Sequence, residues 1–94
     1  MSQPDAIVRP SPDVVAQGVG DETVLVHLQT NKIFTLNATG ARFWELLTTG
    51  LSPDEIVERM LAEFDVEEPA LRAEIDSLVS ALAREDLVTG RGSG

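Results

Sequence analysis

The chain of 94 residues contains no cysteine, which excludes disulfide bonds and thiolate metal sites. It also has no apolar run of about eighteen residues that would suggest a membrane helix. Its N-terminus lacks the basic-then-apolar pattern of a secretory signal. The hydrophobic content of 43% is ordinary for a globular chain. We therefore expect one soluble, cytoplasmic domain that does not bind a membrane.

Basic residues are scarce: seven Lys and Arg face sixteen Asp and Glu, which gives a formal net charge of −9. Proteins that bind nucleic acid draw much of their affinity from Lys and Arg that neutralise phosphates. A domain this acidic repels the phosphate backbone, so no nucleic-acid partner is expected. The same charge favours a basic peptide or a basic partner protein.

Residues that carry out catalysis are also few. The one histidine, His27, lies on the face of its strand opposite Val24, Val26 and Leu28, and we expect a surface or sheet residue there. A lone histidine is a poor zinc site, because zinc takes three or four ligands. The glutamates of the second half are spaced as a solvated helix surface. The sequence therefore predicts neither an enzyme nor a metal or cofactor site.

The first half of the chain is typical of β-structure. Residues 1–12 hold three of the five prolines and predict a flexible, extended lead-in. Strands are predicted over 13–19, 23–28 and 33–36. Gly20 supplies turn chemistry between the first two, and Asn31 is expected to adopt a positive φ in the second link. The result is an antiparallel meander.

The second half is typical of helices. Asn37 and Thr39 offer side-chain oxygens to the free N–H groups of a helix that follows the last strand. Ser52 and Glu55 form a capping box for the next helix, and Pro69 opens a third that ends near Arg84. The predicted fold class is α+β and winged-helix-like, with a three-stranded antiparallel sheet followed by three helices. The domain is expected to span 13–88, with Leu87 and Val88 folding back and a flexible tail over 89–94.

The last strand and the third helix together suggest a binding surface. Strand 33–36 ends the meander, so one row of its backbone N–H and C=O groups is expected to be unpaired, and such an edge captures extended peptides. On a helical wheel, four apolar residues of the third helix form its core seam: Leu71, Ile75, Leu78 and Leu82. Val79 lies on one shoulder with Arg72 and Asp76. That shoulder is either peripheral core or the second wall of a groove.

Several stretches resemble one family. They are Asn31-Lys-Ile-Phe-Thr-Leu-Asn-Ala-Thr-Gly-Ala41, Leu51-Ser-Pro-Asp-Glu-Ile-Val57 and Phe64-Asp-Val66. Together they resemble PqqD-like proteins, the RiPP recognition elements, which bind the leader of a ribosomally made precursor peptide. The Leu36-Asn37-Ala38-Thr39-Gly40 junction is most similar to the stand-alone recognition proteins of lasso-peptide clusters.

The resemblance implies a fold, a site and partners. In the family the leader adds antiparallel to the third strand and lies between that strand and the third helix. The peptide-binding strand implied here comprises Lys32, Ile33, Phe34, Thr35 and Leu36. For the helix wall, the helical wheel selects Leu71, Arg72, Ile75, Asp76 and Val79. The implied partners are the precursor leader and a maturation enzyme, either a leader peptidase or a radical SAM enzyme.

Three alternatives remain open. The first is a peptide chaperone of the pyrroloquinoline quinone type that serves a radical SAM enzyme. The second is a winged-helix transcription regulator, which needs a basic recognition helix, whereas the stretch from Leu71 to Glu85 carries three acids and two arginines. The third is a dimerisation module that pairs through the same strand edge.

Overall fold

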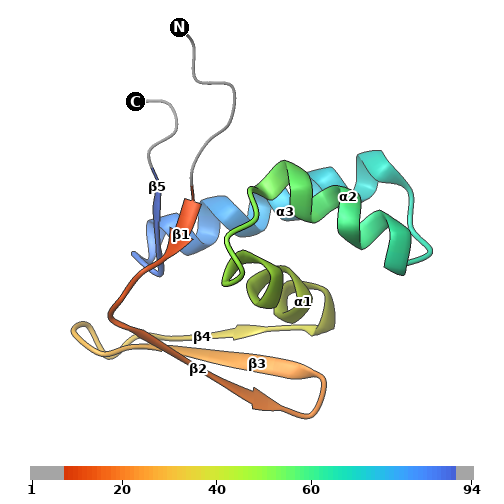
Figure 1. Ribbon diagram of the computed structural model, residues 1–94. Helices are drawn as coiled ribbons and strands as arrows, with labels where there is room; N and C mark the ends of the chain where they lie inside the picture. Colours follow the sequence, from red (N-terminus) through yellow and green to blue (C-terminus); the bar gives the residue numbers. More distant parts are fainter. Residues whose placement is uncertain (1–7, 91–94) are drawn as a thin grey trace, which may run out of the picture.

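The structure, a computed structural model, describes residues 8–90, which form two antiparallel sheets and three helices (Figure 1). The larger sheet has the order β2-β3-β4, with strands β2 (Val14–Val19), β3 (Glu22–His27) and β4 (Ile33–Leu36). The helices that follow are α1 (Ala38–Leu47), α2 (Pro53–Glu63) and α3 (Glu68–Arg84). The predicted fold class is confirmed. No helix of residues 8–90 is long and apolar enough to cross a bilayer.

The turns and helix starts follow from local sequence. Asn31 has φ 62° in the link between β3 and β4, as predicted, and Gly20 has φ 64° between β2 and β3. The side-chain oxygen of Asn37 accepts from the N–H of Gly40 at 2.9 Å. The capping box of Ser52 and Glu55 is complete, with backbone-to-side-chain bonds of 3.2 and 2.9 Å. These bonds satisfy N–H groups that have no partner within their helices.

A second, two-stranded sheet joins the two ends of the described chain. Strand β1 (Val8–Pro10) pairs antiparallel with β5 (Val88–Gly90). Leu87 and Val88 are buried after the end of α3, so the chain that follows this helix lies beside β1. The N–H of Ser11 donates to the Leu87 carbonyl at 3.0 Å. The sequence predicted a lead-in over 1–12 and a tail over 89–94, whereas residues 8–10 and 88–90 form strands. Residues 1–7 and 91–94 lie outside the described part.

The helices cover one face of the larger sheet (Figure 1). Leu25 and His27 point from β3 into that layer, with 0% and 5% of their surface exposed. The sequence predicted a surface or sheet residue at His27, and the structure has a sheet residue that is buried, not exposed. Nδ1 of the ring accepts from the Gln29 N–H at 3.2 Å. The core comprises Leu25, Leu36, Phe43, Trp44, Leu46, Leu47, Ile56, Val57, Met60, Leu71, Ile75, Leu82, Leu87 and Val88.

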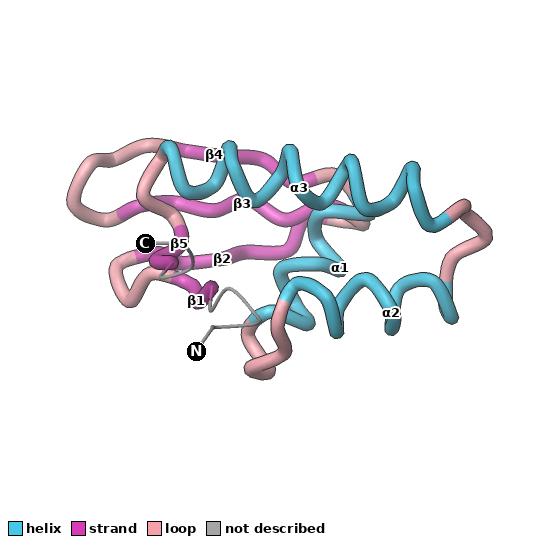
Figure 2. Tube along the Cα trace, turned by 90° about the horizontal axis from the view of Figure 1, so that it is seen from above, coloured by secondary structure: helices cyan, strands magenta, loops and turns pink. Residues whose placement is uncertain are grey.

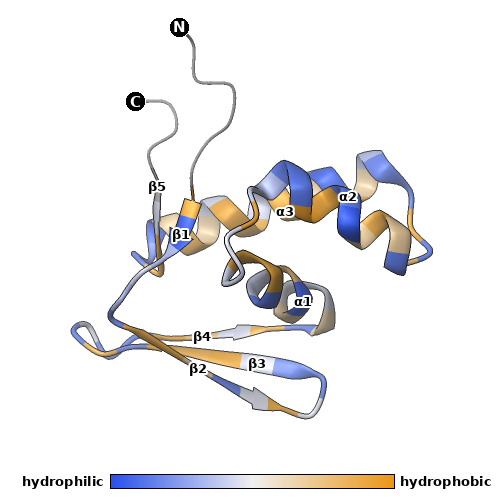
Figure 3. Ribbon diagram, in the orientation of Figure 1, coloured by the Kyte–Doolittle hydropathy of each residue, from blue (hydrophilic) through white to orange (hydrophobic). Residues whose placement is uncertain are grey.

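No helix of residues 8–90 lies over the opposite face of the sheet. Val15, Val26 and Ile33 stand in one cross-strand row on that face, as the strand register requires. Val15 is 48% and Ile33 69% exposed. Hydrophobic colouring along β2 and β3 is visible in Figure 3. Apolar residues therefore occur on both faces of this sheet, which is why alternation alone did not identify the buried one.

Candidate functional site

Strand β4 has a free edge. It pairs with β3 on one side only, and no strand of residues 8–90 pairs on the other. The N–H of His27 donates to the Lys32 carbonyl at 3.0 Å, which fixes the alternation of the antiparallel ladder. Phe34 and Leu36 then bond to β3, while the N–H and C=O groups of Ile33 and Thr35 point away from it. These are the groups that an added strand would pair with.

A groove runs beside this edge, between β4 and α3. Figure 2 shows α3 alongside β4, and the cavity between them has a volume of about 240 Å³. Leu36 and Ile75, each 2% exposed, form part of its apolar floor, and Phe34 and Leu78 are half-buried there. The full lining is Phe34, Thr35, Leu36, Asn37, Thr39, Gly40, Glu74, Ile75, Ser77 and Leu78. The groove therefore combines apolar pockets with a polar rim.

The glycine of the strand-to-helix junction allows close packing at one end of the groove. A Cβ atom at Gly40 would lie 3.2 Å from Cδ2 and 3.3 Å from Cβ of Leu36. Such contacts are tighter than ordinary van der Waals separations, so a larger residue would push α1 away from β4. The Asn-Ala-Thr-Gly sequence thus sets both the start of α1 and its approach to the strand.

An ion pair connects the start of β4 with the end of α3, outside the residues that line the groove. Lys32 Nζ lies 3.1 Å from Glu85 Oε1, just beyond the end of α3. Lys32 shares the inward face of the sheet with His27, its register partner, and so reaches toward the helix layer. This contact places Lys32 beside the edge strand, outside the groove lining.

Six of the predicted site residues lie on or beside the edge of β4 or in the groove. Phe34, Thr35, Leu36 and Ile75 line the groove, and Lys32 directly precedes β4. Ile33 lies on the edge, but its side chain points to the uncovered face of the sheet and only its backbone faces a potential peptide. Leu71 is 2% exposed and belongs to the core rather than to the groove.

The predicted wall of Arg72, Asp76 and Val79 lies elsewhere. Arg72 donates to Glu68 at 2.8 Å and to Asp54 of α2 at 3.0 Å, and these hydrogen bonds raise its pKa. Asp76 and Val79 line a separate cavity of about 310 Å³ against Val8 and the start of α2. Helix α3 therefore faces β4 with the side that carries Glu74 and Leu78, whereas the side that carries Val79 faces α2 and β1.

Six groove residues are not among the predicted site residues: Asn37, Thr39 and Gly40 at the junction, and Glu74, Ser77 and Leu78 on α3. The sequence of the junction indicates the start of a helix, and this pattern does not show that the same residues line a groove. A helical wheel places Glu74 on the shoulder opposite Val79, and that shoulder is the one that faces β4. Which shoulder faces the strand depends on the side from which α3 packs, and the wheel does not contain that information.

The described residues contain no group of three or more His, Asp or Glu side chains that could hold a metal ion. The site offers backbone hydrogen-bonding groups, apolar pockets and a few exposed charges. This arrangement suits recognition of an extended chain by strand addition.

The family matched by the sequence agrees with this geometry. The family described as "Coenzyme PQQ synthesis protein D (PqqD)" matches residues 22–88, which is more than half of the chain. The chain therefore belongs to the PqqD family. No curated protein matches the sequence significantly.

Two solved structures are similar to this one. The structure "TbiB1 in Complex with the TbiA(beta) Leader Peptide" is 39% identical in sequence to this chain and has a TM-score of 0.83. The match covers 90% of this chain and 99% of that one. "Lasso peptide synthetase B1 complexed with the leader peptide" is 23% identical with a TM-score of 0.78, covering 87% of this chain and 96% of that one. At that identity the second structure supports the fold alone.

Proposed function

We propose that this protein binds the leader region of a ribosomally synthesised precursor peptide as an added strand on β4. The observation that carries the proposal is the coincidence of two features: the unpaired backbone groups of Ile33 and Thr35, and the groove beside them. Main-chain pairing supplies affinity, and side chains that enter the groove supply selectivity. The 39%-identical relative was solved with a leader peptide, which supports this choice of ligand.

The bound peptide runs antiparallel to β4, as the resemblance to the family implies. Alternate side chains then point into the groove and away from it, with a period of two residues. Those that point inward meet Phe34, Ile75 and Leu78, so apolar leader residues are expected at these positions. Glu74 stands exposed at the rim, where it favours a basic leader residue nearby.

The protein acts as a non-catalytic, cytoplasmic adaptor that delivers the peptide to a maturation enzyme in lasso-peptide biosynthesis. The strand-to-helix junction resembles that of lasso-peptide recognition proteins, which favours a leader peptidase over a radical SAM enzyme as the recipient. Helix α3 carries Glu68, Glu74 and Asp76 against Arg72 and Arg84, which argues against insertion into a DNA groove.

Hydrogen exchange tests the proposed mode of binding directly. The leader peptide of the cognate precursor is added, and backbone amide exchange is measured by NMR. We expect slower exchange at Ile33 and Thr35, because their N–H groups become bonded to the peptide. The amides of Ala16 and Gly18 on the opposite edge strand serve as the internal control and are expected to exchange at an unchanged rate. Binding without protection at β4 would contradict strand addition.

A further inference from the structure

The sheet has a second free edge, on β2. The N–H of Leu28 donates to the Asp13 carbonyl at 2.8 Å, which sets the alternation of the β2–β3 ladder. The backbone groups of Val14, Ala16 and Gly18 therefore point away from β3. The N–H of Val14 donates to Ser11 at 3.2 Å, so the vacant positions are at Ala16 and Gly18. No strand of residues 8–90 pairs with them.

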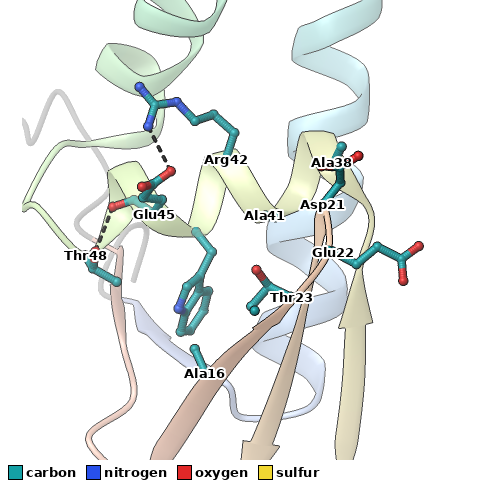
Figure 4. Close-up of a pocket in the computed structure, with 12 residues that line it drawn as sticks. Ala16, Asp21, Glu22, Thr23, Ala38, Ala41, Arg42, Glu45 and Thr48 are labelled. Carbon is teal, nitrogen blue, oxygen red and sulfur yellow. Dashed lines mark hydrogen bonds and ion pairs between the residues drawn. The ribbon is translucent and has the colours of Figure 1, made fainter.

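A hollow lies beside this edge, between the β2–β3 hairpin and α1 (Figure 4). Its volume is about 580 Å³, larger than that of the groove at β4. Ala16 and Gly18 share the inward face of the sheet with Leu25, and their small size leaves the space open. A Cβ atom added at Gly18 would find nothing within 4 Å. Ala38 and Ala41 continue the small-residue lining on the helix side.

Trp44 is one of the residues that line the hollow, although it is only 5% exposed. Its indole N–H bonds to no other described residue, and every fully enclosed side-chain polar atom of the described residues has a partner. The N–H therefore keeps contact with solvent. A nearly buried indole donor without a partner favours a ligand that brings an acceptor, such as a peptide carbonyl.

The rim of the hollow is acidic. Asp21 and Glu22 are exposed at the hairpin turn, and neither forms an ion pair with another of residues 8–90. Arg42 does not offset them, because it binds Glu45 at 2.8 Å and Glu63 at 2.6 Å; Figure 4 shows the contact with Glu45. The uncompensated charge here is negative.

We propose that β2 and this hollow form a second strand-addition site, which takes an extended segment of another protein that carries Lys or Arg. Pairing occurs with Ala16 and Gly18, a peptide carbonyl accepts from Trp44, and the basic side chain lies against Asp21 and Glu22. A second copy of this chain does not fit, because it would bring two acidic rims together in molecules of net charge −9. Since β2 and β4 are opposite edges of one sheet, both sites can be occupied together.

NMR titration tests this proposal with a defined probe, a short capped peptide of alternating valine and arginine. Trp44 is the only tryptophan, so its indole N–H gives a single signal. We expect that signal to shift and the Ala16 and Gly18 amides to exchange more slowly. A matched peptide with glutamate in place of arginine is expected to bind about tenfold more weakly or less, because it loses the charge complementarity.

Two variants sharpen the test. Gly18→Val places a side chain in the hollow, where a Cβ atom at this position meets nothing within 4 Å, and is expected to weaken binding of the arginine peptide about tenfold. Asp21→Asn with Glu22→Gln changes only exposed side chains and is expected to remove the preference for arginine over glutamate. An unmoved indole signal, equal binding of the two peptides, or protection at Ile33 and Thr35 instead would each overturn the second site. None of these outcomes would affect leader binding at β4, which is measured separately.

Discussion

Lys32 Nζ lies 3.1 Å from Glu85 Oε1, and this ion pair joins the start of β4 to the end of α3. At the other end of the strand, Leu36 lines the same cavity as Glu74. The strand and the helix therefore run in opposite directions. A peptide that pairs antiparallel with β4 consequently runs parallel to α3, and its C-terminal part passes the ion pair.

The ion pair itself is expected to contribute little to stability. The Lys32 side chain is 59% exposed, and exposed pairs contribute about 0.2–1 kcal/mol. In a double-mutant cycle of Lys32→Ala and Glu85→Gln, we expect a coupling free energy of unfolding below about 1 kcal/mol that shrinks at high salt. Urea unfolding measures it. A coupling above about 2 kcal/mol, insensitive to salt, would contradict this account.

Thr35→Pro is expected to abolish leader binding while it leaves the helical circular dichroism largely unchanged. The Thr35 N–H faces the free edge, so proline removes a donor to the peptide and none to β3. Ala16→Pro is the matched control, because Ala16 holds the equivalent position on the other edge strand. Calorimetric titration with the leader peptide measures both. Equal loss of binding in the two variants would contradict addition at β4.

The side of α3 that faces the peptide can be tested with two serines. Ser77 and Ser80 are both exposed on α3, but Ser77 lines the groove at β4 and Ser80 lines the cavity near Val79. We expect Ser77→Trp to weaken leader binding by about tenfold or more, because the ring occupies the groove. Ser80→Trp should bind normally. The reverse result would restore the Val79 shoulder as the peptide wall.

The sequence was most informative where structure depends on neighbours in the chain. The positive φ of Asn31, the cap by Asn37 and the capping box of Ser52 and Glu55 each involve residues within one turn, and each prediction is confirmed. The strand over Ile33–Leu36 was predicted with its observed bounds. These features follow from backbone hydrogen bonding over short distances.

The features that were missed depend on contacts between distant segments. Strands β1 and β5 have three residues each and come from opposite ends of the described chain, so neither shows a periodicity of its own. The buried face of β3 was not identified, because Val24 and Val26 are as apolar as Leu25. Likewise, the helical wheel of α3 identified three buried seam residues, Leu71, Ile75 and Leu82, but the Val79 shoulder that was predicted to face β4 lies against α2 and β1. Long-range packing decides each of these.

Phe43→Ala is expected to unfold the domain. Phe43 is 0% exposed in the core, and such truncations cost roughly 3–5 kcal/mol. The whole stability of a domain of this size is roughly the same, about 3–5 kcal/mol. Val66→Ala serves as the control, since Val66 is 45% exposed and its truncation should cost less than about 1 kcal/mol. Thermal unfolding followed by circular dichroism distinguishes the two. A cooperative transition near that of the wild type in Phe43→Ala would contradict the assignment of the core.

The ion pair between α1 and α2 makes stability depend on pH. Arg42 donates to both carboxylate oxygens of Glu63, at 2.8 and 2.6 Å, and this hydrogen bonding lowers the pKa of Glu63 below its ordinary value. Because the folded pKa is below the unfolded one, the stabilisation is fully present above the unfolded pKa and is lost as the pH falls through the folded pKa.

Glu63→Gln is therefore expected to lower the urea midpoint at about pH 7 and to have progressively less effect as the pH falls through the lowered pKa of Glu63 and the wild-type carboxylate becomes protonated as well. Glu58→Gln is the matched control on α2, because Glu58 is exposed and forms no ion pair with another of residues 8–90. Its midpoint should follow that of the wild type at each pH. A deficit in Glu63→Gln that stayed constant from neutral to acid pH would show that the side chain stabilises the helix pair by packing, not through its charge.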